Sequence, residues 1–212
     1  SRPLLCWMPE EHPAHKGASP FSITDTAQGR TASRPYQLRR AFNPGLRPGS
    51  RFAFFGTPPI PVLYGAETEE AAICETLLHD VPNAGGVLHH RDYADKVAAR
   101  LILRRDLRLA SFLGTGLRAF GVGASALTDT PASTYRQTVA WAQAAHAAGF
   151  DGAAWMSRRC NSDRAYVLFG DRVVPGDLEQ DPGFGRIFGT GLDLDRLIDW
   201  CATVRVDVMP PI

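Results

Sequence analysis

The apolar residues of this chain occur in short runs separated by glycine and proline, and this pattern restricts the fold more than any other feature. Runs of about five residues are typical of single strands, whereas a membrane-spanning helix needs about 20 apolar residues in succession. The clearest runs lie at residues 51–55, 62–66, 153–156 and 165–169. The sequence therefore predicts several short strands and no membrane span.

Helix signals lie between these runs. The segment 68–80 begins with Thr68, a residue type favoured at helix N-caps. A second helix is predicted over about 132–148, because Thr130-Pro131 precedes it and Gly149 follows it. A third amphipathic helix is predicted over 193–204. Short strands mixed with dispersed helices favour a single α+β domain.

Composition excludes several classes of function. The chain has 212 residues, 44% of them apolar, and a net charge of +1, which suits one globular domain. A dedicated nucleic-acid binder carries a basic excess, so direct nucleic-acid binding is not expected. The four cysteines and six histidines show no metal-ligand spacing, so we expect free thiols and no metal. The first residues lack the apolar segment of a signal peptide, which favours a cytoplasmic location.

The stretch Gly114-Thr115-Gly116-Leu117-Arg118-Ala119 matches a weak dinucleotide-binding pattern. That pattern has meaning only where it opens a helix within a βαβ unit. Gly121 and Gly123 follow at once and disfavour a helix, and no downstream βαβ unit is recognisable. The sequence therefore predicts a glycine-rich loop over 114–125 rather than a nucleotide site.

Four polar residues in or beside predicted elements are the best candidates for chemistry. Arg51 begins an aromatic run, and Tyr64 lies in the next strand, immediately before the helix that carries Glu75. Ser157 ends the strand 153–156 and is followed by two arginines. Each residue alone is compatible with an ordinary structural role, and only the combination indicates a site.

The combination resembles the RES family, which is named for arginine, glutamate and serine. The resemblance is carried by FNPG and SRF over 42–52, by VLYGAETEEAAICETLLH over 62–79, and by GFDG, SR and LF over 149–169. It implies an α+β fold with a split mixed sheet like that of the ADP-ribosyltransferases. It also implies a toxin that degrades NAD⁺ and is held inactive by an Xre-like antitoxin. We accordingly divide the chain into a loop-rich segment, 1–38, and a catalytic domain, 39–212.

The resemblance assigns catalytic roles to Arg51, Tyr64, Glu75 and Ser157. Cleavage of the nicotinamide–ribose bond builds positive charge on the sugar, as in glycoside hydrolysis, and a preorganised carboxylate stabilises that charge. Glu75 is the candidate for this role. Nicotinamide leaves readily, so the reaction needs no metal and no protein nucleophile.

Binding of NAD⁺ is expected to involve several of the same residues. The pyrophosphate suits the planar, permanently charged fork of arginine, supplied by Arg51 and, as a second candidate, Arg158. Phe52 and Tyr64 offer rings for stacking, and Ser157 offers a hydrogen bond to the nicotinamide amide or a phosphate. Phe52 stands where many members have Tyr or Trp, so a phenolic hydrogen bond is absent there.

The sequence leaves undecided the roles of two tryptophans and the choice among three functions. Trp141 has the spacing of a core residue, whereas Trp155 is a candidate for lining the site. The acceptor of ADP-ribose is water, phosphate or a protein side chain, so the alternatives are a glycohydrolase or phosphorylase and a protein ADP-ribosyltransferase. A third alternative is a binding module without turnover.

Overall fold

The structure is a computed structural model that describes residues 11–14, 16, 21–25, 42–45 and 50–210. Within these residues, eight strands form one sheet in the order β1-β6-β7-β8-β3-β2-β5-β9, and β10 pairs with β4. The strands are β1 (Glu11–Ala14), β2 (Phe21–Asp25), β3 (Val62–Ala66), β4 (Gly86–Leu88), β5 (Lys96–Leu103), β6 (Leu107–Phe112), β7 (Gly152–Met156), β8 (Arg164–Phe169), β9 (Leu178–Ile187) and β10 (Val206–Val208). The α-helices are α1 (Glu69–Thr76), α2 (His90–Tyr93), α3 (Gly114–Ala119), α4 (Ala124–Leu127), α5 (Tyr135–Ala147) and α6 (Gly191–Thr203).

The large sheet is mixed and is nearly divided into two halves. Strands β6 and β7 are parallel, and the other described neighbours in this sheet are antiparallel. The halves meet at β2 and β3, which share the single residue pair Phe21↔Ala66. The expected α+β class with a split mixed sheet is confirmed.

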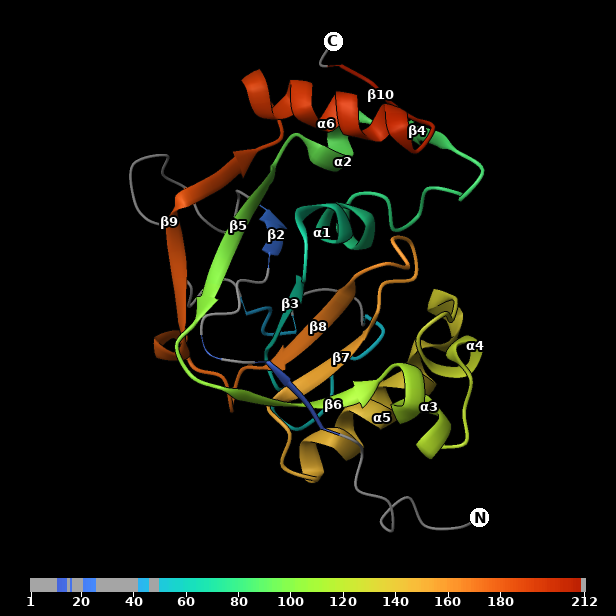
Figure 1. Cartoon of the computed structure of the whole chain (residues 1–212), viewed down its shortest axis with the longest axis vertical. Helices are drawn as coiled ribbons and strands as arrows, with labels where there is room; N and C mark the ends of the chain where they lie inside the picture. The colour runs from blue at the N-terminus through green and yellow to red at the C-terminus, as the bar shows by residue number, and fades with distance from the viewer. Residues whose placement is uncertain (1–10, 15, 17–20, 26–41, 46–49, 211–212) are drawn as a thin grey trace.

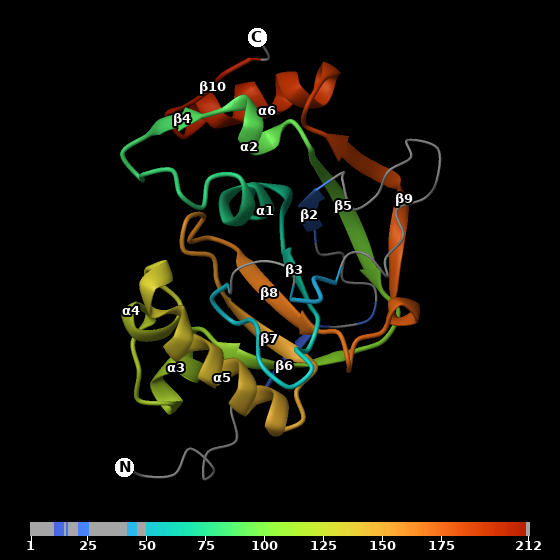
Figure 2. The same ribbon diagram turned by 180° about the vertical axis from the view of Figure 1, so that it is seen from behind.

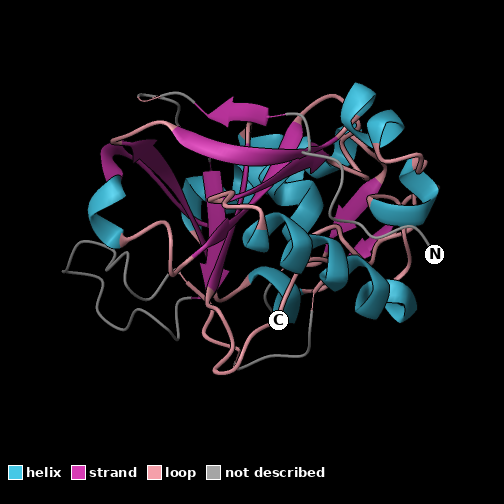
Figure 3. Cartoon of the chain, turned by 90° about the horizontal axis from the view of Figure 1, so that it is seen from below, coloured by secondary structure: helices cyan, strands magenta, loops and turns pink. Residues whose placement is uncertain are grey.

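The helices cover the two halves separately. Helices α3, α4 and α5 lie beside β6 and β7, and α1 lies between β3 and α6 in both opposite views (Figures 1 and 2). Figure 3 shows most helices gathered to one side of the long curved strands. Around β7 the core is aromatic and includes Phe52, Phe112 and Trp155, whereas Ile73 of α1 packs in a second core with Leu197 of α6.

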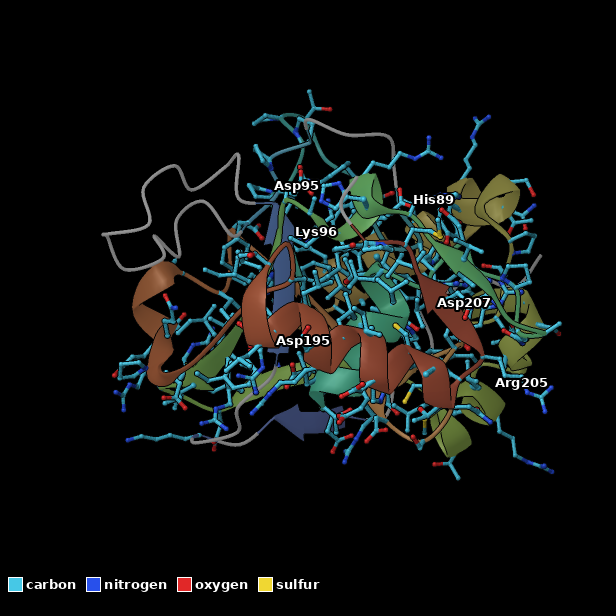
Figure 4. All side chains as sticks on the ribbon, turned by 90° about the horizontal axis from the view of Figure 1, so that it is seen from above. His89, Asp95, Lys96, Asp195, Arg205 and Asp207 are labelled. Carbon is cyan, nitrogen blue, oxygen red and sulfur yellow. The ribbon has the colours of Figure 1, made fainter. Side chains whose placement is uncertain are left out.

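The end of the molecule capped by α6 and β10 carries both polar and apolar exposed side chains, the latter including Leu192 and Met209. Asp195, Arg205 and Asp207, labelled in Figure 4, are exposed there. The neighbouring Lys96 Nζ lies 2.9 Å from the Asp95 carboxylate. The Lys96 side chain is 17% exposed, so this ion pair is partly shielded from water.

Several local predictions are confirmed. Thr68 caps α1, and its hydroxyl accepts a hydrogen bond from the Ala71 amide at 3.1 Å. Gly149 follows α5 with a φ of +90°, a conformation that glycine adopts without steric cost. The strands predicted at 62–66, 153–156 and 165–169 are β3, β7 and β8, and the helix predicted at 193–204 is α6.

Two local predictions are wrong. Residues 51–55 form a turn and a loop, because their aromatic side chains enter the core from a bend rather than from alternating strand positions. Residues 114–125 contain α3 and α4, and α3 follows β6 directly within a parallel β6–β7 crossover. Glycine is needed at Gly116 because a Cβ atom there would lie 2.2 Å from the carbonyl oxygen of Ser111. Gly114 and Gly121 have positive φ angles, so turn geometry and this one close contact account for three of the glycines without a nucleotide.

The segment 1–38 contributes to the same sheet as the rest of the chain. Its described residues include β1, which pairs with β6, and β2, which pairs with β5. Residues 26–41 lie outside the described residues, so the division at 38/39 stays a prediction.

Replacing Gly152 with Ala is expected to lower the free energy of unfolding by about 1–3 kcal/mol. A Cβ atom at Gly152 would lie 2.1 Å from the carbonyl oxygen of Val167 and 3.1 Å from Leu168 Cα, both in the paired strand β8. Backbone atoms cannot move aside without disturbing the β7–β8 ladder. Urea unfolding followed by circular dichroism measures the change, with Gly185→Ala in β9 as the control, since a Cβ there meets nothing within 4 Å. Equal stability of the two variants would contradict this account.

Candidate active site

The loop that carries Arg51 is fixed by hydrogen bonds on both sides of the residue. The Tyr64 hydroxyl accepts from the Phe52 amide at 3.2 Å and is 2.8 Å from the Ser50 Oγ. The Thr138 hydroxyl donates to the Arg51 carbonyl. Burial raises the pKa of Tyr64 to about 12, so this side chain remains a neutral phenol near neutral pH. Tyr64 therefore positions the backbone around Arg51.

The Arg51 side chain is buried and incompletely hydrogen bonded. It is 4% exposed, and its Nη1 donates to Thr130 Oγ1 at 2.7 Å. The guanidinium carbon lies 5.3 Å from the centre of the Tyr135 ring. Burial lowers the pKa of Arg51, against the opposing effects of Tyr135 and Glu75. Its Nη2 is buried and has no hydrogen-bond partner among the described residues. A buried charged donor of this kind is costly unless an acceptor binds to it.

Glu75 is held by the segment that follows β7. Its Oε1 accepts from Ser157 Oγ at 2.6 Å and from the Arg158 amide at 3.0 Å. The Ser157 Oγ also accepts from the Cys160 amide at 3.1 Å. Since Ser157 is fully buried, this chain of bonds fixes the direction of the carboxylate. The arrangement joins α1 to the end of β7.

Arg158 adds a second cation to the site. Its side chain forms an ion pair with Asp129, and its Nη1 is 3.5 Å from the Thr130 carbonyl oxygen. Burial lowers the pKa of Arg51, and the positive charge of Arg158 acts in the same direction. Two carboxylates, Glu75 and Asp129, accompany the two arginines, and the buried Nη2 of Arg51 is the donor that favours a further anion.

These hydrogen bonds and charge interactions bring five of the predicted site residues into one region: Arg51, Tyr64, Glu75, Ser157 and Arg158. Phe52 is the exception. It is 0% exposed, and its ring packs against Trp155 at 4.9 Å and Phe112 at 5.4 Å between ring centres. Because no face of the ring is open, the structure gives Phe52 a packing role in place of the expected stacking on a ligand.

The two tryptophans lie in the aromatic core. Trp155 is 2% exposed, with its indole nitrogen buried and unpaired among the described residues. Trp141 packs against Phe120 at 5.1 Å between ring centres, as its helical spacing predicts. Trp155 therefore packs against the site residue Tyr64 in an edge-to-face contact, with 6.0 Å between the ring centres.

Three further residues, none of them a site candidate from the sequence, lie around Arg51 and Glu75. Thr130 accepts from Arg51, Tyr135 lies under its guanidinium, and His79 bonds to the Tyr135 hydroxyl. The sequence indicates only that Thr130 precedes a helix. The residue types alone carry no signal of these contacts, which join parts of the chain far apart in sequence.

Neither a metal cluster nor a reactive thiol emerges from the described residues. No group of three or more His, Cys, Asp or Glu side chains is gathered to hold a metal in the part of the chain that the structure describes. Among the same residues, Cys74, Cys160 and Cys201 are free thiols, and burial raises the pKa of Cys74 to about 12. No described helix is both long and apolar enough to cross a membrane.

Fold and site together define an α+β domain in which a buried arginine, on the loop before β3, lies within electrostatic influence of an oriented glutamate held at the end of β7. The RES domain model matches residues 27–184, and the chain belongs to the RES domain family. The predicted family is thereby confirmed.

One solved structure with a similar fold is the crystal structure of the M. tuberculosis MbcT–MbcA toxin–antitoxin complex. The similarity has a TM-score of 0.53 at 14% sequence identity and covers 82% of this chain and 85% of that chain. At this identity the likeness concerns the fold alone. A search of curated proteins found no match.

Proposed function

We propose that this protein is the toxin of a toxin–antitoxin pair and that it cleaves the nicotinamide–ribose bond of NAD⁺. The observation that carries the proposal is the buried Arg51, whose Nη2 lacks a partner among the described residues while its charge interacts with that of Glu75. A guanidinium shielded from water beside an oriented carboxylate suits a ligand whose phosphates bind the guanidinium and whose reacting group develops positive charge near the carboxylate.

In this proposal Arg51 and Arg158 bind the pyrophosphate. The unpaired Nη2 of Arg51 donates to a phosphate oxygen. Arg158 pairs with Asp129, so in this proposal a phosphate replaces a carboxylate as the partner of this cation. Charge-assisted hydrogen bonds of this kind are the strong ones in a water-poor site.

Glu75 stabilises the transition state. As the bond between ribose C1′ and the nicotinamide nitrogen breaks, its electron pair leaves with neutral nicotinamide and positive charge develops on the sugar ring. The Ser157 hydroxyl and the Arg158 amide hold Glu75 Oε1, so the carboxylate needs little reorganisation during the reaction. We assign Ser157 primarily to this positioning, because both hydrogen-bonding functions of its Oγ are engaged.

Water or phosphate then adds at C1′, which yields ADP-ribose and a proton or ADP-ribose 1″-phosphate. The partner in this proposal is an Xre-like antitoxin. The MbcT–MbcA crystal structure, which is a toxin–antitoxin complex, supports an antitoxin partner for a domain of this fold. We place the reaction in the cytoplasm, where NAD⁺ is available.

The test is incubation of the purified protein, free of any partner, with NAD⁺ in buffers with and without phosphate. We expect nicotinamide release by liquid chromatography, and a strong dependence on phosphate identifies phosphorolysis. Label from adenine-labelled NAD⁺ distinguishes the remaining alternative, because transfer to protein in added cell extract indicates an ADP-ribosyltransferase. The absence of nicotinamide release under all three conditions would exclude both enzymatic functions and leave a binding module.

A further inference from the structure

Tyr135 contacts the site from a helix for which the sequence indicates no functional role. It is the first residue of α5 and is half-buried. Its ring centre lies 5.3 Å from the guanidinium carbon of Arg51, and its hydroxyl is 3.1 Å from Nε2 of His79. Tyr135 is therefore in contact with residues from both sides of the site.

The ring of Tyr135 helps to hold a cation that has few other partners. The Arg51 side chain makes one described hydrogen bond, to Thr130, and is otherwise removed from water. An aromatic face attracts a guanidinium and also fixes the plane in which its donors point. One turn later on α5, Thr138 donates to the Arg51 carbonyl. Residues i and i+3 of one helix face thus contact the side chain and the backbone of Arg51.

The hydroxyl of Tyr135 reaches toward the helix that carries Glu75. His79 lies in the turn after α1, and its carbonyl oxygen accepts from Arg159 Nε at 3.2 Å and Nη2 at 2.8 Å. Arg159 is two residues beyond Ser157, which orients Glu75. Burial raises the pKa of Tyr135, so the phenol remains a hydrogen-bond donor near neutral pH. The hydroxyl therefore connects α5 to His79, which is bonded to the same segment, residues 157–159, that orients the Glu75 carboxylate.

We propose that Tyr135 is a positioning residue that sets the orientation of the Arg51 guanidinium relative to Glu75, with its ring against the arginine and its hydroxyl on His79. In its effect on NAD⁺ cleavage this inference rests on the proposed function. Because Tyr135 acts through the arginine that binds the pyrophosphate, its loss affects substrate binding more than the chemical step.

The experiment compares Tyr135→Leu, Tyr135→Phe and Trp141→Leu in the full chain. Tyr135→Leu removes the ring, and we expect KM for NAD⁺ to rise about five- to thirtyfold with a smaller change in kcat. Tyr135→Phe restores the ring, and we expect KM to return to within about threefold of the original value. Trp141→Leu removes a ring from the same helix that packs against Phe120 instead of Arg51. It is expected to lower the melting temperature and leave KM unchanged.

The hydroxyl is tested by combining Tyr135→Phe with His79→Leu. If these two side chains act through one hydrogen bond, the double variant has the KM of either single variant rather than the product of their effects. An unchanged KM in Tyr135→Leu, whatever its melting temperature, would overturn the proposed role of the ring.

A readout without turnover separates this inference from the proposed function. In the ¹⁵N-labelled protein, the Arg51 Nε–H resonance is expected to be single and sharp, to broaden or shift in Tyr135→Leu, and to persist in Tyr135→Phe. If the protein releases no nicotinamide and this pattern holds, the proposed function fails and the positioning role stands. If the resonance is the same in all three proteins, the positioning role fails by itself.

Discussion

Replacing Glu75 with Gln is expected to lower kcat for nicotinamide release by about 10²- to 10³-fold, with the protein still folded. Glutamine keeps the carbonyl oxygen that accepts from Ser157 Oγ and the Arg158 amide, so the contacts between α1 and the end of β7 remain. What is lost is the negative charge that stabilises the positive charge developing on the ribose. Because this charge develops mainly in the transition state, KM is expected to change much less than kcat.

The control for this variant is Glu70→Gln on the same helix. Glu70 is exposed, so the substitution removes the same charge from α1 without touching the site. Initial rates of nicotinamide release over a range of NAD⁺ concentrations give kcat and KM, and a thermal melt checks folding. If Glu75→Gln retains the activity of Glu70→Gln, the carboxylate is not the stabilising group.

Replacing Arg51 with Lys is expected to raise KM for NAD⁺ by about 10- to 100-fold, as expected for lost hydrogen bonds to a charged group. Lysine keeps the positive charge but has no planar fork. It cannot donate to Thr130 Oγ1 and present a second donor in the geometry of the unpaired Nη2 at the same time. It also loses the flat contact with Tyr135.

The matched control is Arg136→Lys, an exposed arginine on α5 immediately after Tyr135. Titration calorimetry with ADP-ribose, which carries the pyrophosphate without nicotinamide, measures the binding contribution separately from catalysis. We expect a loss of affinity for ADP-ribose in Arg51→Lys and none in Arg136→Lys. Equal affinities would place the pyrophosphate elsewhere in the protein.

Some of the site follows from local sequence. Thr68 begins the helix that carries Glu75, and apolar strand sequences place Tyr64 near the start of that helix and Ser157 after β7. Capping and strand propensity act over a few residues, so these signals can be recognised in the sequence without knowledge of the fold. The order of these motifs was also sufficient to predict the family, which the RES domain match confirms.

Other parts of the fold could not be predicted because tertiary contacts override local preference. The aromatic run at 51–55 has the composition of a strand, yet it forms a loop whose side chains fill the core beside Trp155. Strand β9 contains Pro182, Gly183 and Gly185, which disfavour a strand, and it is formed by its pairing with β5.

By itself the sequence determined which residue types are available for the site and which local elements carry Tyr64, Glu75 and Ser157. Only the tertiary structure decided their surroundings. It buried Phe52 in the core, brought Thr130 to Arg51 across 79 positions of the chain, and set Tyr135 beneath the guanidinium. The reason is physical: propensities and caps depend on neighbours in sequence, whereas burial and the pairing of charged groups depend on which distant segments the folded core brings into contact.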